Sequence, residues 1–203
     1  MAFPGFFNEA PGITVRDGLA DFLGASEDGR IEYGYADAVK LAGHSCPTVA
    51  GAWLMVRAAL RALYGGQLPE RGGVRVDMVE AEDTGTTGVI AQVFTLVTGA
   101  AAGNGFQGIG GRFSRYGLLR HGVDGGGIAR FIRVDTGAAV EVGMDLSGVP
   151  ADTPLRPLLQ AAMAEDASAQ ARAAFAQVWQ GRVRRLLLEH ADDPAVIQVR
   201  PLG

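Results

Sequence analysis

The 203-residue chain is poor in cysteine and lysine: Cys46 and Lys40 are each the only residue of their kind, so 17 of its 18 basic residues are arginine. A single cysteine excludes an intrachain disulfide framework and any zinc ribbon built from cysteine pairs. The opening residues, MAFPGFFNEAPG, lack a basic stretch followed by a long apolar segment. We therefore expect no signal peptide, no membrane span and a cytoplasmic location.

Neither sign of charge is in large excess. The formal net charge is −4 and the isoelectric point is near 5.4, which weighs against a nucleic-acid-binding protein. Apolar residues make up 48% of the chain, enough to form a hydrophobic core. The length predicts one domain over residues 1–150 and a C-terminal helical extension over residues 151–203. We expect this extension to pack on the same domain or on the partner subunit of a homodimer.

The clearest helix signal lies in residues 47–64, where apolar side chains recur at spacings of three and four. Pro47 suits the first helical position, and Gly65-Gly66 provides a stop. A second core helix is predicted over residues 88–97. We expect further helices over residues 14–23, 35–42, 158–164 and 168–190, the last being long and amphipathic, and a turn over residues 26–34.

Period-two alternation predicts the strands. They are residues 74–82, 112–119, 127–135, 138–146 and 196–200, with a hairpin between the third and fourth and an edge strand at the end. The fold class is therefore α+β, with a mixed or antiparallel sheet packed by the two core helices. Glu80 and Glu82 continue the apolar face of the first strand. Either a cation, a metal or an arginine lies near them, or the strand has left the core by Glu80.

The chemical centre of the sequence is the segment Gly43-His44-Ser45-Cys46-Pro47, just before the long core helix. A residue before proline is pushed out of the helical region, so Cys46 should be extended or should cap the helix. In an extended segment His44 and Cys46 would point the same way. Helix N–H groups and the helix dipole lower the pKa of a nearby thiol. This pattern predicts a ligand pair or an activated thiol.

Three interpretations of the pair remain open. A transition metal such as zinc accepts imidazole nitrogen and thiolate sulfur together, and its further ligands would come from Glu80, Glu82, Asp83 or His121. Alternatively, Cys46 is a nucleophile activated by His44. A third possibility is a haem or other tetrapyrrole held by one of the two residues. His121 is otherwise expected to be an exposed turn residue, and His190 a surface residue favoured by a helix dipole.

The most glycine-dense stretch is residues 99–111, which contains Gly103, Asn104 and Gly105. Its glycines formally match a dinucleotide-binding pattern, but the stretch follows a helix instead of a strand. We expect instead a loop whose backbone closely approaches a small-molecule ligand or another subunit. Gly103, Asn104 and Gly105 are therefore the candidate ligand-binding residues.

The order of these motifs resembles the FmdE family of formylmethanofuran dehydrogenase proteins. The matching segments are Gly43-His44-x-Cys46-Pro47 opening a helix, Val79-Glu80-Ala-Glu82 closing a strand, and Thr98-Gly99 followed by Gly103-Asn-Gly105. The family pattern reads Gly-His-x-Cys-Pro-Gly, Glu-Thr-Asp-x-Cys and Thr-Gly-Cys-Thr-x-Gly-x-Gly. The likeness covers residues 35–119.

The resemblance implies an α+β domain that binds a transition metal, commonly zinc, near His44 and Cys46. It also implies an enzymatic or accessory role in one-carbon or molybdenum- and tungsten-enzyme metabolism. The chain departs from the family in three ways: Thr48 replaces a glycine, Thr84 and Ala100 stand at or near two family cysteines, and a zinc-ribbon tail is missing. A carboxylate, Glu82 or Asp83, would then replace the second cysteine, or a different cofactor would bind.

Overall fold

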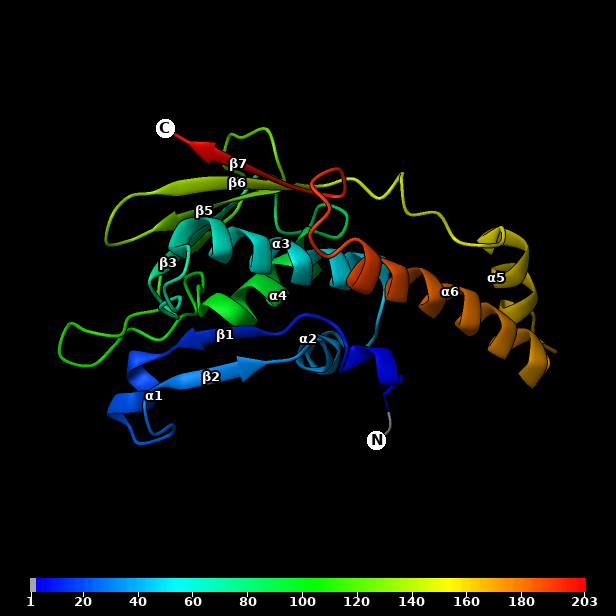
Figure 1. Ribbon diagram of the computed structural model, residues 1–203, viewed down its shortest axis with the longest axis horizontal. Helices are drawn as coiled ribbons and strands as arrows, with labels where there is room; N and C mark the ends of the chain where they lie inside the picture. Colours follow the sequence, from blue (N-terminus) through cyan, green and yellow to red (C-terminus); the bar gives the residue numbers. More distant parts are fainter. Residues whose placement is uncertain (1–2) are drawn as a thin grey trace.

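The structure, a computed structural model that describes residues 3–203, is built around a five-stranded mixed sheet (Figure 1). The strand order is β4-β3-β5-β6-β7; β4 runs parallel to β3, and the other neighbours are antiparallel. The strands are β3 (Val74–Met78), β4 (Leu119–Arg120), β5 (Ala129–Arg133), β6 (Ala139–Met144) and β7 (Ile197–Leu202). The α+β class, the β5–β6 hairpin and the β7 edge strand are confirmed.

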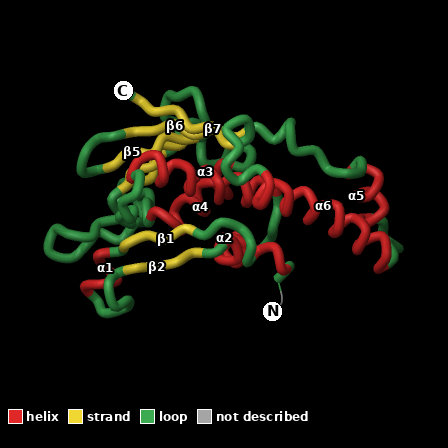
Figure 2. The backbone as a smooth tube through the Cα atoms, viewed as in Figure 1, coloured by secondary structure: helices red, strands yellow, loops and turns green. Residues whose placement is uncertain are grey.

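Helices α3 (Pro47–Tyr64) and α4 (Thr87–Thr98) pack against the sheet and against each other. They lie between the five-stranded sheet and a two-stranded hairpin, so the body has three layers (Figure 2). Because α3 is covered on both sides, Trp53 and Met55 are fully buried. The long core helix predicted over residues 47–64 is confirmed, and α2 (Tyr35–Ala42) matches its prediction and packs against α4.

The hairpin corrects two predictions. Residues 14–23 do not form one helix: β1 (Ile13–Arg16) comes first, and α1 (Gly18–Phe22) begins only after the helix cap Asp17. Residues 26–34, expected to be a turn, include β2 (Arg30–Tyr33), which pairs antiparallel with β1. Three of residues 13–16 are β-branched, which favours a strand. In the structure the burial of these four residues alternates, as expected for a strand with one buried face. A short 3-10 helix, η1 (Gly5–Phe7), precedes the hairpin.

Two predicted strands are shorter than expected. β3 ends at Met78, where its register with β5 stops at the Met78–Ala129 pair, and Glu80 and Glu82 lie in the exposed loop that follows. Of the strand expected over residues 112–119, only Leu119 belongs to a strand, as part of β4, and Arg112 forms an isolated bridge with Ile109. The carboxylates therefore lie outside the core, which removes the need to compensate a buried charge.

The face of the sheet away from α3 and α4 carries charged side chains. Register places one of them on each strand, in the order Arg120, Asp77, Arg130, Glu141 and Arg200. Opposite charges directly across neighbouring strands attract each other. Glu141 accepts a 2.6 Å hydrogen bond from Arg200 and lies 3.5 Å from Arg130. Charge alternation thus stabilises the register on the side where no helix packs.

The C-terminal region is a helical arm, α5 (Leu155–Met163) followed by α6 (Ala169–Glu189). The buried residues of α6 are Val183, Leu186 and Leu187, near its C-terminal end, where the helix packs against α3. Figure 1 shows α5 and the N-terminal half of α6 extending away from the body. The predicted extension therefore packs on the same domain through part of α6. No helix within residues 3–203 is long and apolar enough to cross a membrane.

Candidate functional site

The segment between α2 and α3 holds His44 and Cys46. Cys46 has extended backbone angles (φ −150°, ψ 168°) and caps α3, with its Sγ accepting a 3.4 Å hydrogen bond from the N–H of Val49. Pro47 is the first residue of α3. The capping role predicted for Cys46 is confirmed. The residue lies at the N-terminal end of α3, which is the positive end of the helix dipole.

Helix α6 holds this segment in place. Trp179 Nε1 and Gln180 Nε2 donate to the carbonyl oxygen of Ser45, at 2.9 Å and 3.1 Å. The Ser45 hydroxyl lies 3.0 Å from Tyr35 Oη and donates to Gln180 Oε1. His44, the residue before, stays exposed, and its Nδ1 lies 3.0 Å from the Ala42 carbonyl oxygen. The segment is therefore anchored, with the thiol buried and the imidazole exposed.

The predicted carboxylate ligands lie in the loop between β3 and α4. Both Glu82 and Asp83 are exposed. Within residues 3–203, no three side chains of histidine, cysteine, aspartate or glutamate gather in a way that could hold a metal ion. The described part of the chain thus provides no ready-made three-ligand centre at His44 and Cys46.

A cleft of about 420 Å³ lies beside α4, within the size range of small-molecule sites. We call it the α4 cleft. One face of α4 forms a wall. The other lining residues come from the end of α2, the segment before β3, the loop after β3, the glycine-rich segment, and β4 with the residue that follows it. Its polar lining residues are Arg71, Glu82, Gln92, Thr95, Asn104 and His121; its apolar ones include Leu41, Ala91, Leu96 and Leu119. Apolar walls with a few convergent polar groups are typical of binding sites.

His121 is the unusual residue of this cleft. It was expected to be an exposed turn histidine, but it is half-buried, and its Nε2 is buried without a hydrogen-bond partner among residues 3–203. A buried polar atom left without a partner costs about 1–3 kcal/mol. Such an atom beside a cleft is one that a bound molecule could satisfy.

The glycine-rich segment contributes to the cleft through one of its three predicted residues. Asn104 lines the cleft, whereas Gly103 and Gly105 do not. A Cβ atom at Gly105 would lie 2.7 Å from the Arg115 carbonyl oxygen, so the close backbone approach here is to the chain itself. At Gly103 a Cβ would meet nothing within 4 Å. Gly105 therefore allows the loop to pack closely on its own backbone. Of the three predicted residues, Asn104 is the one that lines the cleft.

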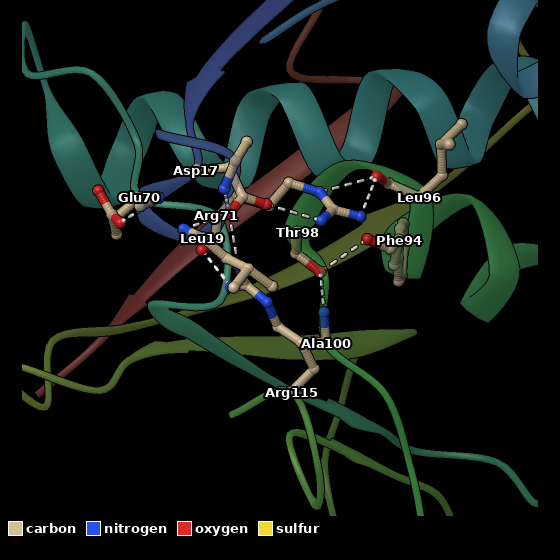
Figure 3. A network of polar contacts seen from close by, with 11 residues as sticks. Asp17, Leu19, Glu70, Arg71, Phe94, Leu96, Thr98, Ala100 and Arg115 are labelled. Carbon is tan, nitrogen blue, oxygen red and sulfur yellow. Dashed lines mark hydrogen bonds and ion pairs between the residues drawn. The ribbon is translucent and has the colours of Figure 1, made fainter. Parts of the chain in front are cut away.

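An ion-pair network includes two residues that line the cleft, Arg71 and Leu96 (Figure 3). Arg71 donates to Asp17 at 2.9 Å, and its Nε and Nη2 donate to the carbonyl oxygen of Leu96 at 3.3 Å and 3.2 Å. Arg115, in the loop that follows the glycine-rich segment, donates to the other carboxylate oxygen of Asp17 at 2.8 Å and also to the Arg71 carbonyl oxygen. One buried carboxylate therefore links α1, the end of α4 and the loop.

The electrostatics of the network keep Asp17 ionised. Burial alone would raise the pKa of its carboxyl group, but the hydrogen bond from Arg71 and the charge of Arg115 outweigh burial and hold the pKa below the ordinary 3.8. Burial lowers the pKa of Arg115, an effect that the charge of Asp17 opposes. The carboxylate also accepts the N–H groups of Leu19 and Ala20. A carboxylate with this many donors is structural.

Another cavity, of about 480 Å³, lies on the charged face of the sheet beside β6 and β7. Its acidic group, Glu141, already accepts hydrogen bonds from Arg200 and from the backbone N–H of Gly126. The N–H of Gly126 lowers the pKa of Glu141, and Arg200 adds to this effect against the opposing effect of burial. The two charged residues that line this cavity, Glu141 and Arg200, are thus bonded to each other, whereas Nε of the neighbouring Arg130 is buried without a hydrogen-bond partner among residues 3–203, as is Nε2 of His121.

Sequence reasoning missed Arg71, Gln92 and Thr95. Gln92 and Thr95 lie one turn apart on α4, and an isolated polar pair on an apolar helix looks like an ordinary solvent-facing strip. Arg71 precedes a glycine pair, with no local signal for its partner Asp17, 54 residues away.

No protein-family model matches the chain, and no curated protein matches it at a significant level. The resemblance to the FmdE family stays a prediction.

Proposed function

We propose that the protein binds a small organic molecule in the α4 cleft, with His121 as a polar anchor. The observation that carries this proposal is the buried, unpartnered Nε2 of His121, a residue that lines the cleft. An imidazole nitrogen is a donor or an acceptor according to its tautomer, so it can bond to a carbonyl, hydroxyl or ring-nitrogen group of a ligand.

The other lining residues suit a ligand that is apolar in part and polar at its edges. Leu41, Leu96 and Leu119 provide apolar contact, and Gln92 and Asn104 add amide groups that can donate and accept. Arg71 contributes less than its charge suggests, because its guanidinium is already bonded to Asp17 and to the Leu96 carbonyl oxygen. The lining therefore favours a neutral, hydrogen-bonding molecule over a strongly anionic one.

Histidine NMR tests this proposal, because the chain has only three histidines. Protein with ¹³C-labelled histidine would be titrated with a library of small hydrogen-bonding heterocycles. Binders should shift the ring signals of His121 and leave those of His190, which is bonded to Asp193 outside the cleft, unchanged. Asn104→Ala and Gln92→Ala should weaken the same binders. A library that yields no binder with this signature would contradict the proposal.

A transition-metal site at His44 is the second candidate function, and the hydrogen-bonding pattern of its ring favours it. When Nδ1 carries the proton and donates it to the Ala42 carbonyl oxygen, Nε2 keeps its lone pair on an exposed ring. Metal-ligating histidines are commonly oriented this way. Cys46, a soft donor at a helix N-terminus, would be the second ligand, and zinc is the expected metal. Its thiol is buried in the helix cap, so binding would require the segment to open.

Metal analysis of the purified protein, together with its absorption spectrum, tests this second proposal. Stoichiometric zinc should be present, and His44→Ala and Cys46→Ala should each lose it. A Soret band would instead identify haem. Zinc that stays in either variant would move the ligands to Glu82, Asp83 or His121, and protein without zinc or other transition metal after growth in metal-supplemented medium would overturn the site.

A further inference from the structure

Two arginines of α3, Arg57 and Arg61, are four residues apart and share a single carboxylate. The Nη1 atom of each donates a hydrogen bond to Oδ1 of Asp192, at 2.9 Å from Arg57. Asp192 lies in the turn that follows α6. Like charges four residues apart destabilise a helix, so the arginine pair requires a counter-charge. One carboxylate neutralises only one of the two positive charges.

The guanidinium groups of this pair keep unused donors. The other hydrogen bond of Arg57, to the Ala191 carbonyl oxygen at 3.4 Å, also comes from Nη1. Within residues 3–203, the Nε and Nη2 atoms of Arg57 and Arg61 donate no hydrogen bond. The hydrogen bond from Arg57 lowers the pKa of Asp192 against the opposing effect of burial, so this carboxylate is ionised at neutral pH. The free donors of an arginine fork match the two oxygens of a carboxylate or phosphate group.

A cavity of about 250 Å³ adjoins the arginine pair, and we call it the α3 cavity. Arg57 and Arg61 both line it, and none of its lining residues within residues 3–203 is acidic. Asp192 instead lines a different cavity, on the other side of Arg61. The side chain of Arg57 is only 15% exposed, so its charge is screened less than that of a surface arginine. The α3 cavity is therefore a positively charged site.

Two further hydrogen-bond donors belong to residues that line the α3 cavity, Thr14 and Gln67. Gln67 accepts from Arg133 through Oε1 at 3.4 Å, which leaves its Nε2 as a donor. On β1, the N–H of Arg16 donates to the Pro69 carbonyl oxygen, on the side away from β2. Backbone N–H groups alternate sides along a strand, so the N–H of Thr14 also points away from β2. The cavity thus combines two cations with neutral donors.

The size, charge and apolar lining of the cavity define the class of ligand. Sites for drug-sized molecules measure about 300–1,000 Å³, so this cavity suits a smaller one. Two arginines and one aspartate leave one net positive charge, which one carboxylate neutralises. A phosphate monoester, with about −1.5 to −2 charges at neutral pH, would exceed it. Ile13, Leu60 and Pro69 provide apolar contact for a short hydrocarbon group.

We propose that the α3 cavity binds a short-chain organic acid, with Arg57 and Arg61 donating hydrogen bonds to its carboxylate and Ile13 and Leu60 contacting its hydrocarbon group. The negative charge of Asp192 weakens the attraction between the arginines and this ligand, so Asp192 sets the affinity. The α3 cavity shares no lining residue with the α4 cleft, and this inference does not depend on the function proposed for that cleft.

Isothermal titration calorimetry of the full chain with carboxylates from acetate to hexanoate, in a buffer free of other carboxylates and of phosphate, tests the proposal. Butyrate should bind more tightly than acetate, because its extra methylene groups are buried. Arg61→Gln should weaken butyrate binding about tenfold or more, since it removes a charged donor. Arg61 is 60% exposed and glutamine suits a helix, so this variant should fold. Arg184→Gln, at an exposed arginine of α6 paired with Glu189, is the matched control and should bind like the wild type.

Asp192→Asn distinguishes a ligand site from an arginine pair that only stabilises the fold. Removing this negative charge should tighten butyrate binding severalfold, although it removes a surface ion pair from the protein. Inorganic phosphate, titrated in the same way, should bind more weakly than butyrate. The proposal would be overturned if no carboxylate binds in the millimolar range, if Arg61→Gln leaves binding unchanged, if Asp192→Asn does not tighten it, or if phosphate binds more tightly.

Discussion

Arg115 and Asp17 lie 98 residues apart in the sequence and form an ion pair of 2.8 Å in which both side chains are buried. Arg71 shares the same carboxylate from the other side. The Arg115–Asp17 ion pair connects the loop after the glycine-rich segment to the N-terminal hairpin. Arg71 connects the hairpin to the end of α4 through its bonds to Asp17 and to the Leu96 carbonyl oxygen. The shape of the α4 cleft therefore depends on residues that do not all line it, and the first predictions concern this network.

Replacing Asp17 with asparagine should destabilise the protein by about 3–5 kcal/mol, because it leaves two largely buried guanidinium groups without their counter-charge. Urea unfolding at neutral pH measures the loss. Asp21→Asn is the control: that residue is paired with Arg16 at the surface, and its loss should cost less than about 1 kcal/mol. Equal losses in the two variants would contradict a central role for Asp17.

The same carboxylate should make stability sensitive to acid. The pKa of Asp17 is lower in the folded protein than its ordinary 3.8, so its contribution is present above that value and is lost as pH falls through the folded-state pKa. The free energy of unfolding, measured by urea titration from pH 6 downward, should fall more steeply for the wild type below pH 4 than for Asp17→Asn. Parallel curves would show that other carboxylates cause the acid sensitivity.

Gly72 should not tolerate a side chain. Its φ of +86° disfavours other residues, and a Cβ atom there would lie 1.2 Å from Arg115 Nη1. Gly72→Ala should therefore displace Arg115 from Asp17 and cost more than the roughly 1 kcal/mol typical of backbone strain. Gly66→Ala, where a Cβ meets nothing within 4 Å, is the control and should be nearly neutral in thermal unfolding. If both behave alike, Arg115 adapts without cost.

Cys46 has two separable roles. As a helix cap it accepts the N–H of Val49, so Cys46→Ala should cost about 0.5–2 kcal/mol, whereas Cys46→Ser keeps a capping oxygen and should cost less. Chemical denaturation of both variants gives the comparison. If the serine variant keeps its stability but loses bound zinc, the thiol is a ligand as well as a cap. A serine variant as unstable as the alanine variant would argue against capping.

His121→Phe should leave stability unchanged or raise it by up to about 1 kcal/mol, since it removes a buried nitrogen that has no partner. The counterpart His190→Phe should destabilise, because Nδ1 of His190 lies 2.9 Å from Asp193. Stability gained by losing a site residue is common where function, not folding, maintains that residue. A large loss of stability in His121→Phe would instead show a structural histidine.

Local sequence determined much of the scaffold. Pro47 and the three- and four-residue spacing of apolar side chains predicted α3 with both of its ends, because helix starts, stops and faces depend on neighbouring residues. The residue before Pro47 was expected to cap, and Cys46 does. The end of β3 was not predicted from the sequence. The alternation continues past Met78 to Glu80, but the strand ends at Met78 because its pairing with β5 ends there.

The candidate site was decided by tertiary structure. Glu82, Asn104 and His121 were noticed separately in the sequence, yet only the tertiary structure brings them to one cleft. Nothing near Asp17 in the sequence indicates Arg71 or Arg115, since an ion pair across 54 or 98 residues leaves no periodic pattern. Sequence alone thus determined the α+β class, α3 and the Cys46 cap, but not the N-terminal hairpin or the length of β3 and β4. Long-range packing decided which polar side chains are satisfied, and it left two buried nitrogens among residues 3–203, Nε2 of His121 and Nε of Arg130, without a hydrogen-bond partner.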